Sequence, residues 1–141
     1  LALTERQSRN LLQAGDVLLT TKGTHNRAFL FPEAVAPAVA GSAFIVVRLL
    51  ATAPVLPAYL AWWLNTEATQ AELRLHARGS AIKNISKEVI ASLAVPIPSL
   101  EQQALMLKIQ ALAERENRIR QQIAQRRNLF TTQLLMDSIK H

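Results

Sequence analysis

The chain has 141 residues, half of them hydrophobic, and its sixteen Lys and Arg residues exceed its ten Asp and Glu residues to give a formal net charge of +6. This length accommodates one domain with an appendage, and the apolar fraction is too high for a disordered chain. The absence of cysteine excludes disulfides, thiolate nucleophiles and Cys-based zinc sites. No apolar stretch is long enough to span a bilayer and no signal peptide opens the chain, so we expect a cytoplasmic protein whose modest basicity suits a polyanionic partner.

The elements expected before residue 99 mix helices and strands. A capping-box pattern from Thr4 to Gln7 opens a short helix toward Leu12, and Ala14-Gly15-Asp16 is a turn. Apolar runs between turn residues predict three strands at 17–21, 27–31 and 43–50, the third of them buried. Helices are expected at 57–64, 66–76 and 86–92, followed by a short strand at 93–95.

The rest of the chain is predicted to be one long helix. All four glycines and all six prolines precede Ser99, and good helix formers dominate after it. Ser99 and Gln102 form a capping box, and about 38 residues rising 1.5 Å each make a rod of roughly 57 Å, part of which must project from a small domain. The fold class is therefore α+β, with a small mixed globular domain at residues 1–98 and a long coiled-coil helix at residues 99–141.

The apolar positions of the long helix alternate in steps of three and four residues, which is the coiled-coil pattern. Two antiparallel copies fit if the numbers of facing residues add to 242, which centres the pair near Gln121. That register sets Glu116 against Arg126, whereas a parallel pair places like charges together; a helix packed on its own domain is the alternative. The expected dimerisation residues are Leu105, Ile109, Leu112, Glu116, Ile119, Ile123, Arg126 and Phe130.

Four pieces of the sequence occur in an order that resembles the target-recognition domain of a type I restriction–modification specificity subunit. The last piece is the most specific, because a short capped helix, a strand ending in Pro-x-Pro and a long helix opening with Glu101-Gln102 are unusual in combination. The pieces are Gly15-Asp16-Val17-Leu18-Leu19, Pro57-Ala58-Tyr59-Leu60 with Trp63-Leu64, Gly79-Ser80, and Ile85-Ser86 through Leu93-Ala94-Val95-Pro96-Ile97-Pro98.

The resemblance implies a protein without an active site of its own that recognises double-stranded DNA and associates with methyltransferase and restriction subunits. It also implies that the long helix is an antiparallel spacer between recognition domains. Full-length subunits of this family have two recognition domains and two spacers, whereas this sequence has one of each, and its Gly-Asp strand comes early. We expect a half-subunit, a degenerate copy or a fragment, with a recognition domain that lacks its front portion. An oligomerising structural protein and a regulatory decoy are the alternatives.

The residues needed for catalysis are not assembled in the sequence. Lys22-Gly23-Thr24 lacks the first glycine and the residue order of a phosphate-binding loop. The six acids before Ser99 are scattered, which does not favour a divalent metal site for a nuclease. His25, His76 and His141 are isolated, so we expect no metal and no cofactor.

Two loops carry the residues expected to contact DNA, one after the Gly-Asp strand and one around Gly79-Ser80. Glycine lets backbone N–H groups approach phosphate, hydroxyl groups donate short hydrogen bonds, and Lys and Arg neutralise charge, while Asn and Arg can read base edges. Two ordinary solvated loops are the alternative. The candidate residues are Lys22, Thr24, Asn26, Arg27, Arg78, Ser80, Lys83, Asn84 and Lys87.

Overall fold

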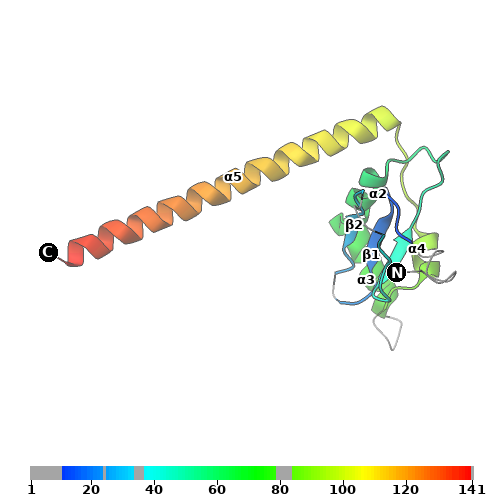
Figure 1. The fold of residues 1–141 in the computed structure, drawn as a ribbon, viewed down its shortest axis with the longest axis horizontal. Coiled ribbons are helices and arrows are strands. Elements are labelled where there is room, and N and C mark those ends of the chain that lie inside the picture. Colours follow the sequence, from blue (N-terminus) through cyan, green and yellow to red (C-terminus); the bar gives the residue numbers. More distant parts are fainter. Residues whose placement is uncertain (1–10, 24, 34–36, 79–83, 141) are drawn as a thin grey trace. The chain divides into compact units, whose positions relative to one another are not determined.

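The computed structural model describes residues 11–23, 25–33, 37–78 and 84–140 (Figure 1). The chain divides into two compact units, residues 1–104 and residues 105–141. The first unit is a small α+β domain and the second is helical, so the predicted fold class is confirmed. In the described part of the chain, no helix is both long and apolar enough to cross a membrane.

The first unit is built on a three-stranded antiparallel sheet with the order β2-β1-β3. Strand β1 (Val17–Thr20) lies in the centre, between β2 (Ala28–Leu30) and β3 (Phe44–Val47). Its side chains alternate, with Val17 and Leu19 fully buried and the intervening residues half-buried, as expected for a sheet that packs on one face. The turn before β1 is confirmed, and Gly15 has a φ of +91° there, a left-handed conformation that glycine adopts without a steric penalty.

Three short helices complete this unit: α2 (Pro57–Leu64), α3 (Glu67–Arg78) and α4 (Lys87–Ser92). Helix α2 packs against β1 and β2, and it buries Leu60 and Leu64 together with Leu73 of α3 in the same apolar core. Helix α4 begins as predicted, because the Ser86 hydroxyl accepts a hydrogen bond from the Val89 N–H at 3.3 Å.

Three predicted elements differ from the structure. Strand β3 is shorter than expected and buries only Ile45 fully, because it lies at the edge of the sheet. Residues 93–95 were expected to form a strand, which is wrong: no ladder includes them among the described residues. The helix expected from Thr4 lies outside the described residues, except that Leu11 and Leu12 are not helical and pair with residues 38–39.

Side chains hold the 93–98 segment in place instead of a neighbouring strand. The Tyr59 hydroxyl donates a 2.9 Å hydrogen bond to the Pro96 carbonyl. Proline has no N–H to offer a ladder, so a segment with Pro96 and Pro98 has few groups left for strand pairing. The segment is an extended connection to the long helix.

Helix α5 (Leu100–Ile139) has 40 residues, about 60 Å at 1.5 Å per residue. Its predicted capping box is confirmed, with the Gln102 N–H donating to the Ser99 hydroxyl at 3.2 Å and the Ser99 N–H donating to the Gln102 Oε1 at 3.1 Å. Gln103 is fully buried in the first unit: its amide donates to the Pro54 and Pro98 carbonyls and accepts from the Leu56 N–H. One side chain therefore fastens the first turn of α5 to two other segments.

Candidate functional site

An ion pair between a buried carboxylate and a half-exposed guanidinium fixes the start of β1 to the end of β3. The Asp16 carboxylate is 1 % exposed and accepts two 2.7 Å hydrogen bonds from the Arg48 guanidinium. It also accepts from the Gln13 N–H at 2.8 Å, and Arg48 donates to the Leu11 carbonyl at 2.9 Å. The Arg48 hydrogen bonds lower the pKa of Asp16 against the opposing effect of burial, so the carboxylate stays ionised.

Two side-chain amides cover the outer edge of β2 and the residues before it. The Gln70 amide accepts from the Asn26 N–H at 3.0 Å and donates to the Asn26 carbonyl at 2.7 Å. The Asn65 amide makes the same two contacts to Ala28, at 2.9 and 2.8 Å. Each amide therefore replaces the hydrogen bonds that a fourth strand would make, which fixes the backbone on both sides of Arg27.

The residues that directly follow the second candidate loop contact the end of β1. The Ile85 N–H donates a 3.3 Å hydrogen bond to the Thr21 carbonyl, across more than sixty residues of sequence. This contact places Asn84 beside the loop that carries Lys22, and the side chains of Asn84 and Lys22 are exposed. Residues from both predicted loops thus belong to one surface.

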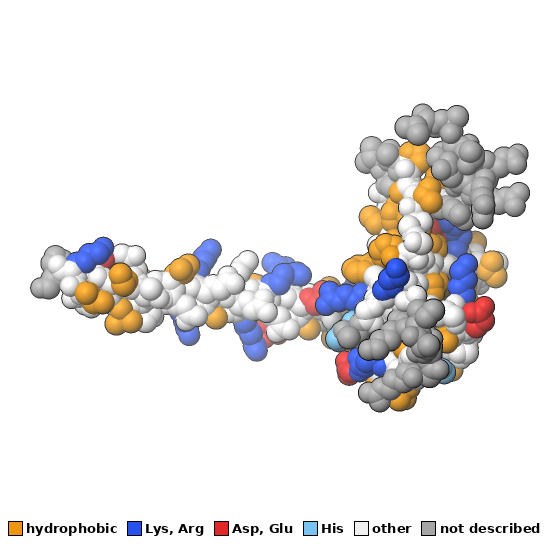
Figure 2. Space-filling model, turned by 90° about the horizontal axis from the view of Figure 1, so that it is seen from below, with side chains coloured by type: hydrophobic (Ala, Val, Ile, Leu, Met, Phe, Trp, Pro, Cys, Tyr) orange, Lys and Arg blue, Asp and Glu red, His pale blue; other side chains and the backbone are white. Residues whose placement is uncertain are grey.

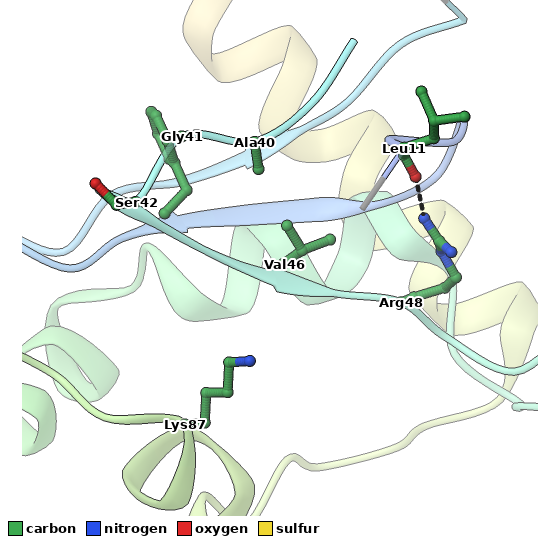
Figure 3. Close-up of a pocket in the computed structure, with 8 residues that line it drawn as sticks. Leu11, Ala40, Gly41, Ser42, Val46, Arg48 and Lys87 are labelled. Atoms are coloured by element: carbon green, nitrogen blue, oxygen red, sulfur yellow. Dashed lines mark hydrogen bonds between the residues drawn. The ribbon is translucent and has the colours of Figure 1, made fainter. Parts of the chain in front are cut away.

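Lys87, at the start of α4, lines a hollow beside β3. The hollow has a volume of about 410 Å³, and Figure 3 shows Lys87 reaching from α4 toward β3 while Arg48 is turned to the Leu11 carbonyl. Next to it, the Glu88 carboxylate accepts from its own backbone N–H and from Ser86, and both bonds lower its pKa. Lys87 is therefore an exposed cation, and the carboxylate of its neighbour Glu88 bonds groups at the start of α4.

The remaining six candidate DNA-binding residues differ in their surroundings. Arg27 is exposed, and together with His25 it lines a second hollow of about 420 Å³. Asn26 is only 3 % exposed, because its side chain donates to the Thr20 carbonyl at 2.8 Å, so it shapes the loop from inside. Arg78 is the last residue of α3. The other three lie outside the described residues: Thr24, Ser80 and Lys83.

The candidate dimerisation residues lie along α5 with their side chains in solvent. The six apolar ones are between 47 and 66 % exposed, which is unusual for a repeating apolar stripe unless a partner covers it. Within the helix, Glu116 accepts a 2.6 Å hydrogen bond from Arg120. These six residues are Leu105, Ile109, Leu112, Ile119, Ile123 and Phe130.

Sequence reasoning missed the residues that hold the surface together, namely Arg48, Asn65, Gln70 and Gln103. Only Arg48 has a local signal, because it is a charged residue within the apolar run of residues 43–51. Such a residue is placed in the interior only when each polar atom finds a partner. The identity of those partners depends on the tertiary fold, so no local pattern names them.

The described residues contain no group of three or more His, Cys, Asp or Glu that could hold a metal ion. The described residues form a small α+β domain, in which Lys22, Arg27 and Lys87 are exposed, and a long helix with an exposed apolar stripe.

The family model described as the type I restriction modification DNA specificity domain matches residues 2–126, and the chain belongs to this family. The family is that of a non-catalytic subunit, and membership implies association with DNA and with the type I restriction–modification complex. No curated protein matches the chain.

Proposed function

We propose that this chain recognises double-stranded DNA for a type I restriction–modification system through the surface at the end of β1, and that α5 pairs two copies antiparallel. Its partners are then the methyltransferase and restriction subunits, in the cytoplasm where the DNA is accessible. No chemical step is assigned to the chain itself.

The observation that carries the DNA-binding proposal is the hydrogen bond from Ile85 to Thr21. It brings Ile85 next to the residue before Lys22, and Lys87, two residues after Ile85, is also an exposed cation, which supports one shared surface. Contacts of Lys and Arg with phosphates supply most of the affinity for duplex DNA and orient the protein on it. Arg27 and Asn84 are then the residues placed to read base edges.

The test is the binding of a fluorescent 30-base-pair duplex by the double variant Lys22→Gln/Lys87→Gln, measured over a range of salt concentrations. Loss of two phosphate contacts lowers the slope of log K against log salt by about two per chain and weakens binding for every DNA sequence alike. The matched control is Lys108→Gln/Lys140→Gln, which removes the same charge from α5 and the residue that follows it. Equal salt slopes for the two double variants would contradict the assignment of this surface.

The alternative function, an oligomerising protein without a DNA role, makes a different prediction. The parent chain would then bind no duplex at about 50 mM salt, where electrostatic binding is strong. Replacement of Arg27 or Asn84 separates recognition from simple charge: under our proposal it changes the preferred sequence in a selection from random duplexes.

The proposal of an antiparallel pair is supported by the stripe on α5. Gln103, which anchors the helix in the first unit, lies about 200° around the helix from Leu105, so the anchor does not use the stripe. In the register with facing numbers that add to 242, Ile119 faces Ile123 and Leu112 faces Phe130, whereas Ile109 faces Gln133 and Leu105 faces Asp137. Glu116, already bonded to Arg120, also meets the partner's Arg126. Two recognition domains would then stand at opposite ends of the rod.

A further inference from the structure

The positive charge of α5 is concentrated in the middle of the helix. Residues 114–127 contain five arginines and two glutamates, all with exposed side chains. The flanking sections have little net charge, with Lys108 before this stretch, and Asp137 and Lys140 after it. Figure 2 agrees, since Lys and Arg side chains stand on opposite sides of the middle of the rod while apolar side chains gather toward its far end. We refer to residues 114–127 as the central arginine section.

Most of this charge is not balanced within the helix. Glu116 pairs with Arg120, and Glu114 accepts a hydrogen bond from Gln110 at 3.0 Å. Among the described residues, Arg115, Arg118 and Arg127 have no acidic partner. Clustered like charges repel each other, so an arrangement of this kind is favourable only where a partner supplies negative charge.

The section is placed symmetrically in the proposed dimer. Facing numbers that add to 242 put the two-fold axis at residue 121, and the centre of residues 114–127 lies midway between residues 120 and 121. The dimer therefore carries ten arginines and four glutamates across its axis. The section is about 21 Å long, close to the length of six base pairs of duplex.

We propose that the central arginine section binds the phosphates of the DNA that lies between the two recognition domains. The inference rests on the proposed function, because it needs the antiparallel dimer and DNA that spans both of its ends. A duplex that reaches from one domain to the other passes the two-fold axis, where the section lies.

DNA fits this surface better than an acidic protein does. Its charge repeats evenly along both strands, so it matches a cationic surface that is symmetrical about a two-fold axis. It also tolerates arginines that point to several sides of the helix, because guanidinium groups on long side chains reach phosphates from different directions. The section then adds affinity without adding sequence preference, since phosphates carry no base information.

The experiment compares Arg118→Gln/Arg127→Gln with the control Lys108→Gln/Lys140→Gln in the full chain. Neither Arg118 nor Arg127 is one of the expected dimerisation residues of α5. Neither has an acidic partner among the described residues. The probe is a 40-base-pair duplex of random sequence, and sedimentation verifies that each variant has the oligomeric state of the parent. We expect the Kd of the arginine variant to rise at least 10-fold at about 100 mM salt and its salt slope to fall by up to four contacts per dimer. The control should stay within about 3-fold of the parent.

Each other outcome is decisive. If the arginine variant binds as tightly as the control, the section does not contact DNA, and its partner is of another class, such as an acidic protein surface. If the parent is a monomer, or binds no duplex, the proposed function fails first and the inference fails with it. If Lys22→Gln/Lys87→Gln binds DNA more weakly than the parent but the arginine variant does not, the proposed recognition surface stands and only the inference about the central arginine section is overturned.

Discussion

Arg48 shows how one residue can hold together the segments beside the proposed DNA-binding surface. It holds Asp16 by two hydrogen bonds and Leu11 by a third, so it joins the segment before β1 to the end of β3. Without Arg48, Asp16 would stay buried with an unpaired charge. Removing one partner of a buried pair is more destabilising than removing a surface pair, because the other charge is left without compensation.

We therefore expect Arg48→Met to lower the free energy of unfolding by about 2–4 kcal/mol. The control Arg74→Met, which breaks the exposed pair with Glu67, should cost less than about 1 kcal/mol. Urea unfolding at pH 7, followed by circular dichroism, measures both. Similar losses for the two variants would mean that the Asp16 pair is no more than a surface contact.

The same pair predicts a dependence on pH. The pKa of Asp16 is lowered in the folded state, so its contribution to stability is present above the unfolded value near 3.9 and is lost as the pH falls through the folded pKa. In Arg48→Met the lowering by Arg48 is gone and burial raises this pKa, so protonation of Asp16 then favours the folded state. The loss of unfolding free energy caused by Arg48→Met should therefore shrink as the pH falls from neutral to about 4. Urea unfolding of both proteins at a series of pH values, followed by fluorescence of the two tryptophans, makes the comparison.

Gln70 links the residue scale to function, because its amide holds both backbone groups of Asn26 and also donates to the Leu64 carbonyl at 2.7 Å. Gln70→Met keeps the size of the side chain but leaves these backbone groups without partners. It should lower the free energy of unfolding by about 2–3 kcal/mol. Because the loop carries Arg27, we expect weaker DNA binding even where the domain is still folded. Gln13→Met, at an exposed position of the first unit, is the control for stability and binding.

At the scale of elements, the antiparallel register of α5 is tested by exchanging one pair of charges. Glu116→Arg places two arginines against each other and should weaken the dimer by about 1–3 kcal/mol, and adding Arg126→Glu should restore much of that loss. Sedimentation equilibrium measures both dissociation constants. A single variant as tightly dimeric as the parent, or a double variant that is not restored, would show that this register is wrong.

At the scale of the whole molecule, the elements that depend on local sequence signals were predicted correctly, whereas those that depend on tertiary packing were not. The start of α5 follows from Ser99 and Gln102, and α2 follows from Pro57, because caps and prolines act within one turn of the chain. The edge position of β3 and the absence of a strand at residues 93–95 depend on which segments lie alongside, which no local pattern contains.

The candidate site divides in the same way. The charged loops could be found from residue types, but Asn26, which was predicted to contact DNA, has its side chain bonded to the Thr20 carbonyl and its backbone bonded to Gln70, 44 residues away. A distant partner of this kind becomes visible only when the fold brings the two segments together. Sequence therefore finds the cations of the surface, and the fold decides which polar side chains support them.

The arrangement of two whole chains has a direct geometric consequence, which can be measured because the protein has no cysteine and any engineered cysteine takes a label cleanly. In the antiparallel register, Glu101 of one copy stands about 40 residues along the rod from Glu101 of the other, so spin labels on Glu101→Cys should lie about 60 Å apart. Labels on Gln121→Cys, at the two-fold axis, should lie much closer together. A parallel pair would give short distances at both positions, because facing residues would then be identical along the whole rod. Pulsed electron paramagnetic resonance distinguishes these patterns, and a short distance for Glu101→Cys would rule out recognition domains at opposite ends.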